Sequence, residues 1–286
     1  MIELFLSAII YGILIGGVFA LMSVGLTLSF GVMRVANSAQ AAFAVLGTFV
    51  AYWSYKLFGI DPLLGVPIGT IILFVLGIIS FKFIVRKTVG PPLASFLVTF
   101  AIALVIENLM VLLWKNEYRS ISTWYSSLSI PLAFIPMPIP MVVAFIGSIV
   151  VIGALTLFLK LSRLGKAIRA TSMDTKGAML VGIDVERIYL LTFGVSTATA
   201  GIGGALLGLI YSFYPALQST WIGFLYVIVI VGGMGSITGT LVSAMLIGII
   251  QSLTQTVLSP VWAITIVYVI LIVVLIFRPE GLMGRR

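Results

Sequence analysis

The sequence predicts an all-α membrane protein, a polytopic bundle of about seven to nine transmembrane helices. Of its 286 residues, 61% are hydrophobic and only 8% are charged, whereas charged residues make up about a quarter of an ordinary soluble domain. Apolar runs near twenty residues recur along the whole chain, and a run of that length crosses about 30 Å of hydrocarbon. A membrane β-barrel would instead show segments of about ten residues with alternating polarity.

The spans follow one another closely, so residues 1–286 are expected to form a single transmembrane domain. The first apolar run is too long for a signal-peptide core and has no basic residue before it, so it is interpreted as a retained span. The predicted spans are residues 5–30, 36–55, 62–84, 94–114, 139–159, 188–211, 221–235, 239–258 and 261–277.

The positive charges predict an orientation with the N-terminus outside and the C-terminus inside. Basic residues gather on the cytoplasmic side of bacterial membrane proteins. With the N-terminus outside, all but three of the 16 lysines and arginines fall inside, the exceptions being Lys56, Lys115 and Arg119. The inner groups are Arg34, then Lys82, Arg86 and Lys87, then the loop from Lys160 to Arg187, then Arg278, Arg285 and Arg286.

Two connections allow alternative interpretations. The outer one, Lys115 to Pro140, contains the proline-rich run IPLAFIPMPIP, which fits an extended or short-helical lid with either a surface or a docking role. The other, Gly232 to Gly239, reads GGMGSITG. It fits a cytoplasmic loop between two crossings or a discontinuous turn inside the membrane, because glycine-rich breaks are tolerated where protein or water surrounds them.

Several function classes are excluded by composition. The chain has no cysteine and no histidine, so thiol chemistry, histidine acid–base catalysis and metal ligation by these residues are ruled out. The phosphate-cradling pattern GxxxxGK[ST] is absent, so no nucleotide site of that kind is expected. The net charge of +8 does not indicate nucleic-acid binding, because the basic residues lie beside membrane spans.

The loop from Lys160 to Arg187 concentrates the charge, with six of the 16 basic residues and three of the eight acidic ones. Asp174 is a good helix N-cap, residues 175–181 can form two turns, and Gly182 is a good C-cap. This short helix resembles the coupling helix of ABC-transporter permeases, which docks in a cleft on an ATPase. An amphipathic helix on the bilayer surface is the alternative. The apolar contact surface would comprise Ala178, Met179 and Leu180.

Three sequence blocks carry a family resemblance. SRLGKAIRATSMDTKGAMLVGIDVERIYLLTF resembles the corresponding loop of the branched-chain amino acid ABC permeases, the LivH/LivM family. GLTLSFGVMRVANSAQAAFAVLGTFVAY is similar to the family's first block, and VIVIVGGMGSITGTLVSAMLIGIIQSL followed by IFRPEGLMG is similar to its last. The blocks occur in the family's order over nearly the whole chain, and they resemble the LivH type more than the LivM type.

The resemblance implies a permease subunit of an ATP-driven importer for small solutes, such as branched-chain or other amino acids, in the inner membrane of a prokaryote. The chain would form half of the translocation pathway, with no catalytic residue, metal or cofactor of its own. Implied partners are a second, LivM-like permease subunit, two ABC ATPases that bind ATP and Mg, an extracytoplasmic solute-binding protein, and membrane lipid. The coupling residues would be Arg169, Asp174, Ala178, Met179, Leu180 and Gly182.

An ion-coupled secondary transporter of a small neutral or zwitterionic solute is the alternative. Such a protein needs charged residues inside the membrane to bind its coupling ions. Glu107 is the only acidic residue well inside a predicted span, which is a poor supply. A membrane-embedded enzyme is a weaker alternative still, because the sequence offers no nucleophile with a histidine base.

Polar and small residues inside the spans are the candidates for a translocation path or a subunit interface. Gln40 replaces a histidine that is usual in the family, so it cannot carry a proton-linked charge. Glu107 could make a structural hydrogen bond, contact the path or reach toward the interface. Small residues recur at four-residue spacing in the sixth span, which fits close helix packing, a pore lining or a subunit contact. The candidates are Asn37, Gln40, Glu107, Asn108, Gly201, Gly204 and Gly208.

Overall fold

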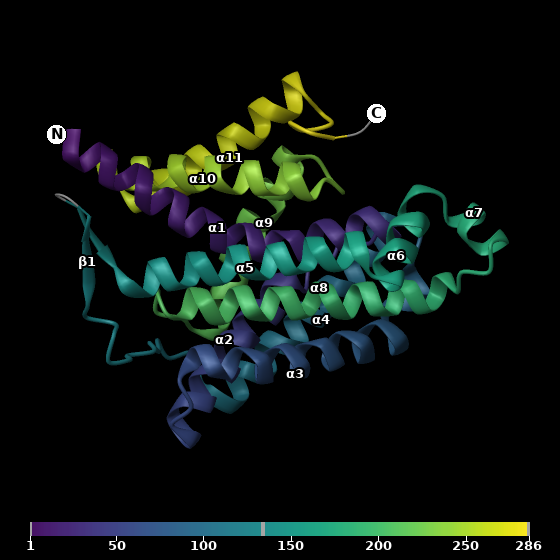
Figure 1. Ribbon diagram of the computed structural model, residues 1–286, viewed down its shortest axis with the longest axis horizontal. Coiled ribbons are helices and arrows are strands. Elements are labelled where there is room, and N and C mark those ends of the chain that lie inside the picture. Colours follow the sequence, from purple (N-terminus) through teal and green to yellow (C-terminus); the bar gives the residue numbers. More distant parts are fainter. Residues whose placement is uncertain (1, 133–134, 285–286) are drawn as a thin grey trace.

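The computed structural model describes residues 2–132 and 135–284 and confirms the helical bundle (Figure 1). In this part of the chain, nine helices are long and apolar enough to cross a membrane. They are α1 (Ile2–Met33), α2 (Gln40–Phe58), α3 (Pro62–Phe83), α4 (Pro92–Trp114), α5 (Ile139–Leu161), α8 (Val185–Gly208), α9 (Gln218–Gly232, preceded by the 3₁₀ turn η2, Pro215–Leu217), α10 (Ile237–Val257) and α11 (Pro260–Phe277). The shorter elements are η1 (Val85–Thr88), α6 (Arg163–Met173), α7 (Thr175–Leu180), β1 (Ser129–Leu132) and β2 (Ile135–Pro138).

The helix boundaries differ from the predicted ones where local hydrogen bonds decide them. The second span begins at Gln40 instead of residue 36, because the chain leaves the helical conformation over residues 34–39 and the Ala39 N–H donates to Asn37 Oδ1. The sixth span begins three residues early, at Val185, because the Asp184 side chain caps the helix by accepting from Arg187 N at 3.1 Å. Neither of these local geometries has a hydropathy signal.

The two ends of the bundle differ in charge. One end, here called the basic end, contains α6, α7, η1 and the C-terminal end of α11. Most of the basic residues lie there, among them Arg34, Lys87 and Lys176. Residues far apart in the sequence meet at this end; for example, Arg86 and Glu186 form an ion pair at 2.7 Å. The other end, the hairpin end, carries the N-terminal end of α1 and the strands β1 and β2 (Figure 1). Arg285 and Arg286 lie outside the described residues.

The proline-rich connection is extended at the hairpin end. β1 and β2 pair antiparallel, with Ser129 opposite Pro138, and Ala133 and Phe134 between them lie outside the described residues. Tyrosine hydroxyls tie this connection to the bundle: Tyr11 donates to Pro136 O at 2.6 Å, and Tyr55 donates to Ser122 O at 3.0 Å. Of the two alternatives for this segment, the extended one is confirmed.

Residues 233–236 of the glycine-rich segment form the turn between α9 and α10 at the basic end, and its remaining residues belong to the two helices. Gly233 and Gly235 have φ angles of 98° and 88°, which favour glycine. The C-terminal segment covers this turn, since the Leu282 N–H donates to Val231 O at 2.8 Å. The two helices that it joins are separate candidates for crossing the membrane.

Two units of four helices, α1–α4 and α8–α11, repeat similar packing in opposite directions. In each unit the second helix packs on the third and fourth, and the first helix packs antiparallel on the third helix of the other unit. The close contacts that define these directions are Gly16 with Ala244 and Gly31 with Gly235 for α1 and α10, and Gly194 with Ile78 and Gly201 with Leu73 for α8 and α3. Inverted repeats of this kind are common in transporters, where binding sites lie between the repeats.

Candidate functional site

The short helices α6 and α7 form a capped pair at the basic end, separated by one residue. Ser162 Oγ accepts from Gly165 N at 2.8 Å and starts α6. Asp174 Oδ1 accepts from Lys176 N at 3.0 Å and starts α7. Gly182 has a φ of 82°, and its N–H donates to Met179 O at 3.0 Å. The structure therefore confirms Asp174 as the N-cap, whereas the C-cap is Val181 and Gly182 follows it in the left-handed conformation.

The apolar residues of α7 divide between the interior and the surface. Ala178 is only 4% exposed and packs toward the bundle, whereas Leu180 is 89% exposed. Arg169 donates to Lys160 O at 3.2 Å, which fixes α6 to the end of α5. The exposed apolar side chains of this region, here called the α7 patch, are Met173, Met179, Leu180 and Val181.

The α6–α7 pair is attached to three spanning helices. Gly165 lies directly against the backbone of Phe158 and Leu159, where any side chain would collide. Ile168 of α6 is buried in an apolar cluster with residues of α1, α5 and α8. A displacement of α7 would therefore move the ends of these long helices, because packed interfaces transmit rigid-body shifts.

Gln40 lies at the centre of a fully buried polar network between the two four-helix units. Its amide Nε2 donates to Met22 O at 3.0 Å and to Ser196 O at 3.1 Å, joining α2 to α1 and α8. Its Oε1 accepts from Asn37 Nδ2 at 3.1 Å, and Ser196 Oγ lies 3.0 Å from it. Gly25 provides the space, because a Cβ there would touch the Gln40 amide. Asn37 and Gln40 thus join helices within this chain.

The small residues of α8 pack against α2 and α3. A side chain at Gly204 would meet the Ala44 backbone, and one at Gly201 would meet Leu73. Thr48 Oγ1 donates to Gly204 O at 2.7 Å across the same contact. Gly208 faces Thr48 in the same way. Of the alternatives for this stripe, the structure shows close packing inside the chain.

Glu107 of α4 makes a hydrogen bond to a residue that the sequence analysis did not single out. Its Oε2 accepts from Gln218 Nε2 at 2.6 Å, and Gln218 is 3% exposed. Asn108, next to it, is exposed and donates to Leu104 O of its own helix at 2.7 Å. A second polar contact, between the hydroxyls of Ser38 and Tyr226 at 2.9 Å, lies further along α9. Tyr226, a polar residue inside the predicted span 221–235, offered a signal in the sequence, whereas Gln218 lies before that span and offered none.

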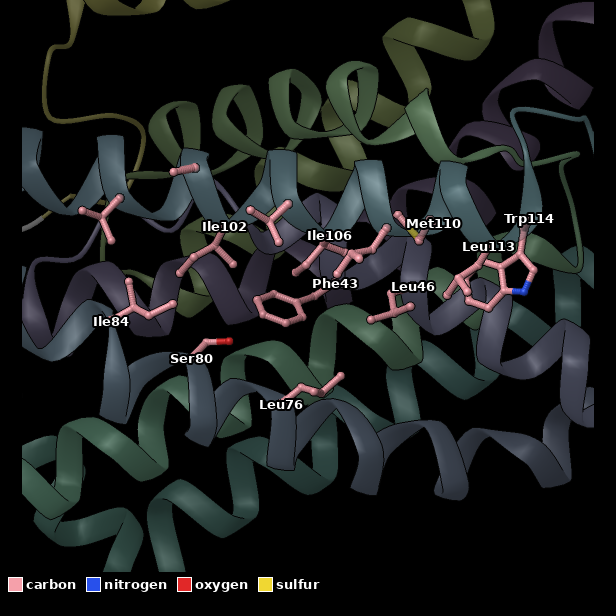
Figure 2. A pocket seen from close by; sticks show the side chains of 14 residues that line it. Phe43, Leu46, Leu76, Ser80, Ile84, Ile102, Ile106, Met110, Leu113 and Trp114 are labelled. Atoms are coloured by element: carbon pink, nitrogen blue, oxygen red, sulfur yellow. The ribbon is translucent and has the colours of Figure 1, made fainter.

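An apolar cavity of about 510 Å³ separates α4 from α3 over the surface of α2 (Figure 2). Phe43 of α2, Leu76 of α3 and Ile106 of α4 are among the side chains around it. Ser80 is its only lining residue with a polar side chain apart from the indole of Trp114. This cavity suits hydrocarbon and offers no match for a charged or zwitterionic solute.

The described residues contain nine candidate spans and two inverted four-helix units, which define a multi-pass membrane protein with an arrangement that is common in transporters. The family model described as the permease component of the branched-chain amino acid transport system matches residues 8–275. The chain belongs to this family. It is therefore a transport permease and not an enzyme.

Curated relatives cover nearly the whole chain. The permease protein BraD of Pseudomonas aeruginosa, named for high-affinity branched-chain amino acid transport, is 26% identical over 98% of this chain and 96% of its own length. LivH of Escherichia coli K12, named likewise, is 25% identical over the same shares. A probable LivH of Methanocaldococcus jannaschii is 30% identical over 97% of this chain and 91% of its own length. No solved structure matches the chain.

Proposed function

We propose that this chain is the permease subunit of an ATP-driven importer for branched-chain or other amino acids. It would form one half of the translocation pathway, and a second, LivM-like permease subunit would form the other. Two cytoplasmic ABC ATPases would bind ATP and Mg, and an extracytoplasmic binding protein would deliver the solute. The family membership and the names of the relatives support this assignment, and the membrane would be the inner membrane of a prokaryote.

The α7 patch is the single observation that carries the coupling mechanism. Leu180 is 89% exposed beside other exposed apolar side chains, and an apolar patch of this kind outside the spans marks an interaction site. We infer that the patch, with Asp174 and Gly182 at the two ends of its helix, docks on an ATPase, and that ATP-driven closure moves α5, α6 and α8 together. Ala178 would support the helix from behind, because its side chain faces the bundle.

Replacing Leu180 with Asp is expected to detach the ATPase while leaving the permease folded. The side chain is almost fully exposed, so no packing inside the chain is lost, but a carboxylate in a desolvated contact is costly. Co-purified ATPase should fall about tenfold or more, as for a central interface residue. Leu128→Asp, which places the same charge at the hairpin end, should retain the ATPase. Equal ATPase recovery from both variants would refute docking at the patch.

Single introduced cysteines test the proposed orientation, with the basic end in the cytosol. The chain has no cysteine of its own, and both Ser127 at the hairpin end and Ser172 in α6 are exposed. A membrane-impermeant thiol reagent should label Ser127→Cys on intact cells, and Ser172→Cys only after the cells are broken. Labelling of intact cells at Ser172 and not at Ser127 would reverse the topology.

A further inference from the structure

The helices α3 and α4 follow one another in the chain but do not pack on each other along their length. Each of them packs on α2, and the 3₁₀ turn η1 contacts both at the basic end. The apolar cavity of about 510 Å³ occupies the space between them (Figure 2). Ligand sites are mostly apolar and usually measure about 300–1,000 Å³. The gap between α3 and α4 is therefore large enough to hold a ligand.

The cavity runs along most of α4 and is open at the surface of the bundle. Its lining residues on this helix begin at Val98 and end at Trp114, sixteen residues or about 24 Å apart. Ala101, Val105 and Leu109, which lie between them, are exposed. One leaflet of a bilayer contributes about half of a hydrocarbon layer of about 30 Å. An extended acyl chain from one leaflet therefore fits along the cavity.

The two ends of the cavity differ in polarity. Figure 2 shows Ser80 and Ile84 at one end and Leu113 and Trp114 at the other. The Ser80 hydroxyl is turned into the cavity and has no hydrogen-bond partner among the described residues, whereas Ser54 of α2 donates to the carbonyl four residues before it. A hydroxyl in apolar surroundings is costly unless it gains a hydrogen bond. This end of the cavity thus favours a ligand with a polar group.

Positive charge lies directly beyond the Ser80 end. η1 begins after Ile84 and carries Arg86 and Lys87, and Lys82 lies in the last turn of α3. Arg86 is paired with Glu186 at 2.7 Å. Lys82 and Lys87 are exposed and form no ion pair with any described residue. From the basic end inward, the site therefore offers two ammonium groups without an acidic partner, then one hydroxyl, and then hydrocarbon.

We propose that this cavity is a binding site for an anionic phospholipid of the leaflet at the basic end. Its acyl chain would lie between α3 and α4, an ester carbonyl would accept from Ser80, and its phosphate would lie by Lys82 and Lys87. Basic pockets between spanning helices bind anionic head groups in this way. A second copy of the chain fits less well, because in the same orientation it brings its own Lys82 and Lys87 to the same end. The site goes beyond the proposed function, since the lipid would fix α3 relative to α4 whatever solute is carried.

The charge is tested with the purified full-length chain in detergent. Phosphatidylglycerol should raise the midpoint of thermal unfolding with increasing concentration, as a ligand of the folded state does, and neutral phosphatidylcholine with the same chains should do so only weakly. The double variant Lys82→Gln with Lys87→Gln should bind phosphatidylglycerol about tenfold more weakly or worse, because each basic residue adds severalfold to the affinity for an anionic lipid. Lys160→Gln with Lys166→Gln, which removes the same charge from α5 and α6, is the matched control and should bind as the wild type does.

Ala101→Phe tests the position of the acyl chain, because the larger side chain would fill the cavity from α4. Native mass spectrometry should detect a retained phospholipid on the wild type and none on this variant. Ala154→Phe, the same change at an exposed alanine of α5, should retain the lipid. Glycerol phosphate, which has the charge but no acyl chain, should leave the unfolding midpoint of the wild type unchanged.

Several results would contradict the site, and they can be told apart. Equal stabilisation by the two phospholipids, or an unchanged affinity in the lysine double variant, would remove the role of the charge. Lipid retained by Ala101→Phe would place the chain outside the cavity. A wild type that purifies with a second permease subunit in place of lipid, and loses it in Ala101→Phe, would give the cavity to a protein partner. If Ala101→Phe does not accumulate, the lysine variants decide alone. None of these measurements needs an ATPase or a solute, so their outcome is separate from that of the proposed function.

Discussion

Gly204→Leu is expected to prevent the protein from accumulating in the membrane. The added side chain would run directly into the Ala44 backbone, and it would break the hydrogen bond from Thr48 Oγ1 to Gly204 O. Overpacking a rigid core typically costs about 1–3 kcal/mol. Here the obstacle is backbone of a neighbouring helix, which cannot adopt another rotamer, so the loss should reach or exceed the upper value. The measurement is the amount of monodisperse protein recovered in detergent and its midpoint of thermal unfolding.

Gly153→Leu is the matched control for this prediction. Gly153 is exposed on α5, and among the described residues no atom outside its own stretch of helix lies within 4 Å of the position that its Cβ would take. The same change in side-chain volume should therefore be tolerated at Gly153. Similar yields and unfolding midpoints for the two variants would show that α8 and α2 are not packed as closely as the structure has them.

Gln40→Leu is expected to lower the thermal stability of the permease strongly. The substitution removes both donors and the acceptor that the Gln40 amide contributes between α1, α2 and α8. The Ser196 carbonyl keeps its hydrogen bond from Thr199 Oγ1, but the buried Asn37 Nδ2 loses its acceptor, and a buried polar group left unsatisfied costs about 1–3 kcal/mol. We expect a total loss of about 3 kcal/mol or more, measured as a shift of the unfolding midpoint in detergent.

Gln40→His tests whether a side chain that keeps part of the hydrogen bonding of Gln40 also keeps part of the stability. An imidazole keeps one donor and one acceptor, and a histidine is the residue that the family resemblance leads one to expect there. This variant should lose less stability than Gln40→Leu. Equal stability of the wild type and Gln40→Leu would mean that the network does not hold the two units together.

The sequence alone determined the class of fold and the positions of the helices. An apolar run that is long enough to span the bilayer, and that does not alternate between apolar and polar residues, forms an α-helix there. The reason is that every backbone N–H and C=O must be satisfied inside the segment. The N-cap of α7 and the glycine that follows its end were also readable, since Asp174 and Gly182 act on neighbours a few residues away. The family followed from motifs that are contiguous in the chain.

Only the tertiary structure decided which residues far apart in the chain are in contact. Gln218 is 111 residues from Glu107, and Gln40 is 156 residues from Ser196, so no local pattern could pair them. In an almost uniformly apolar chain, hydropathy does not show which side of a helix is buried. Ala178 and Leu180 are both apolar in the sequence, yet Ala178 is buried and Leu180 is exposed. Packing of the helices against one another decides that difference, since the close fit of small residues, and not their polarity, selects which surfaces meet.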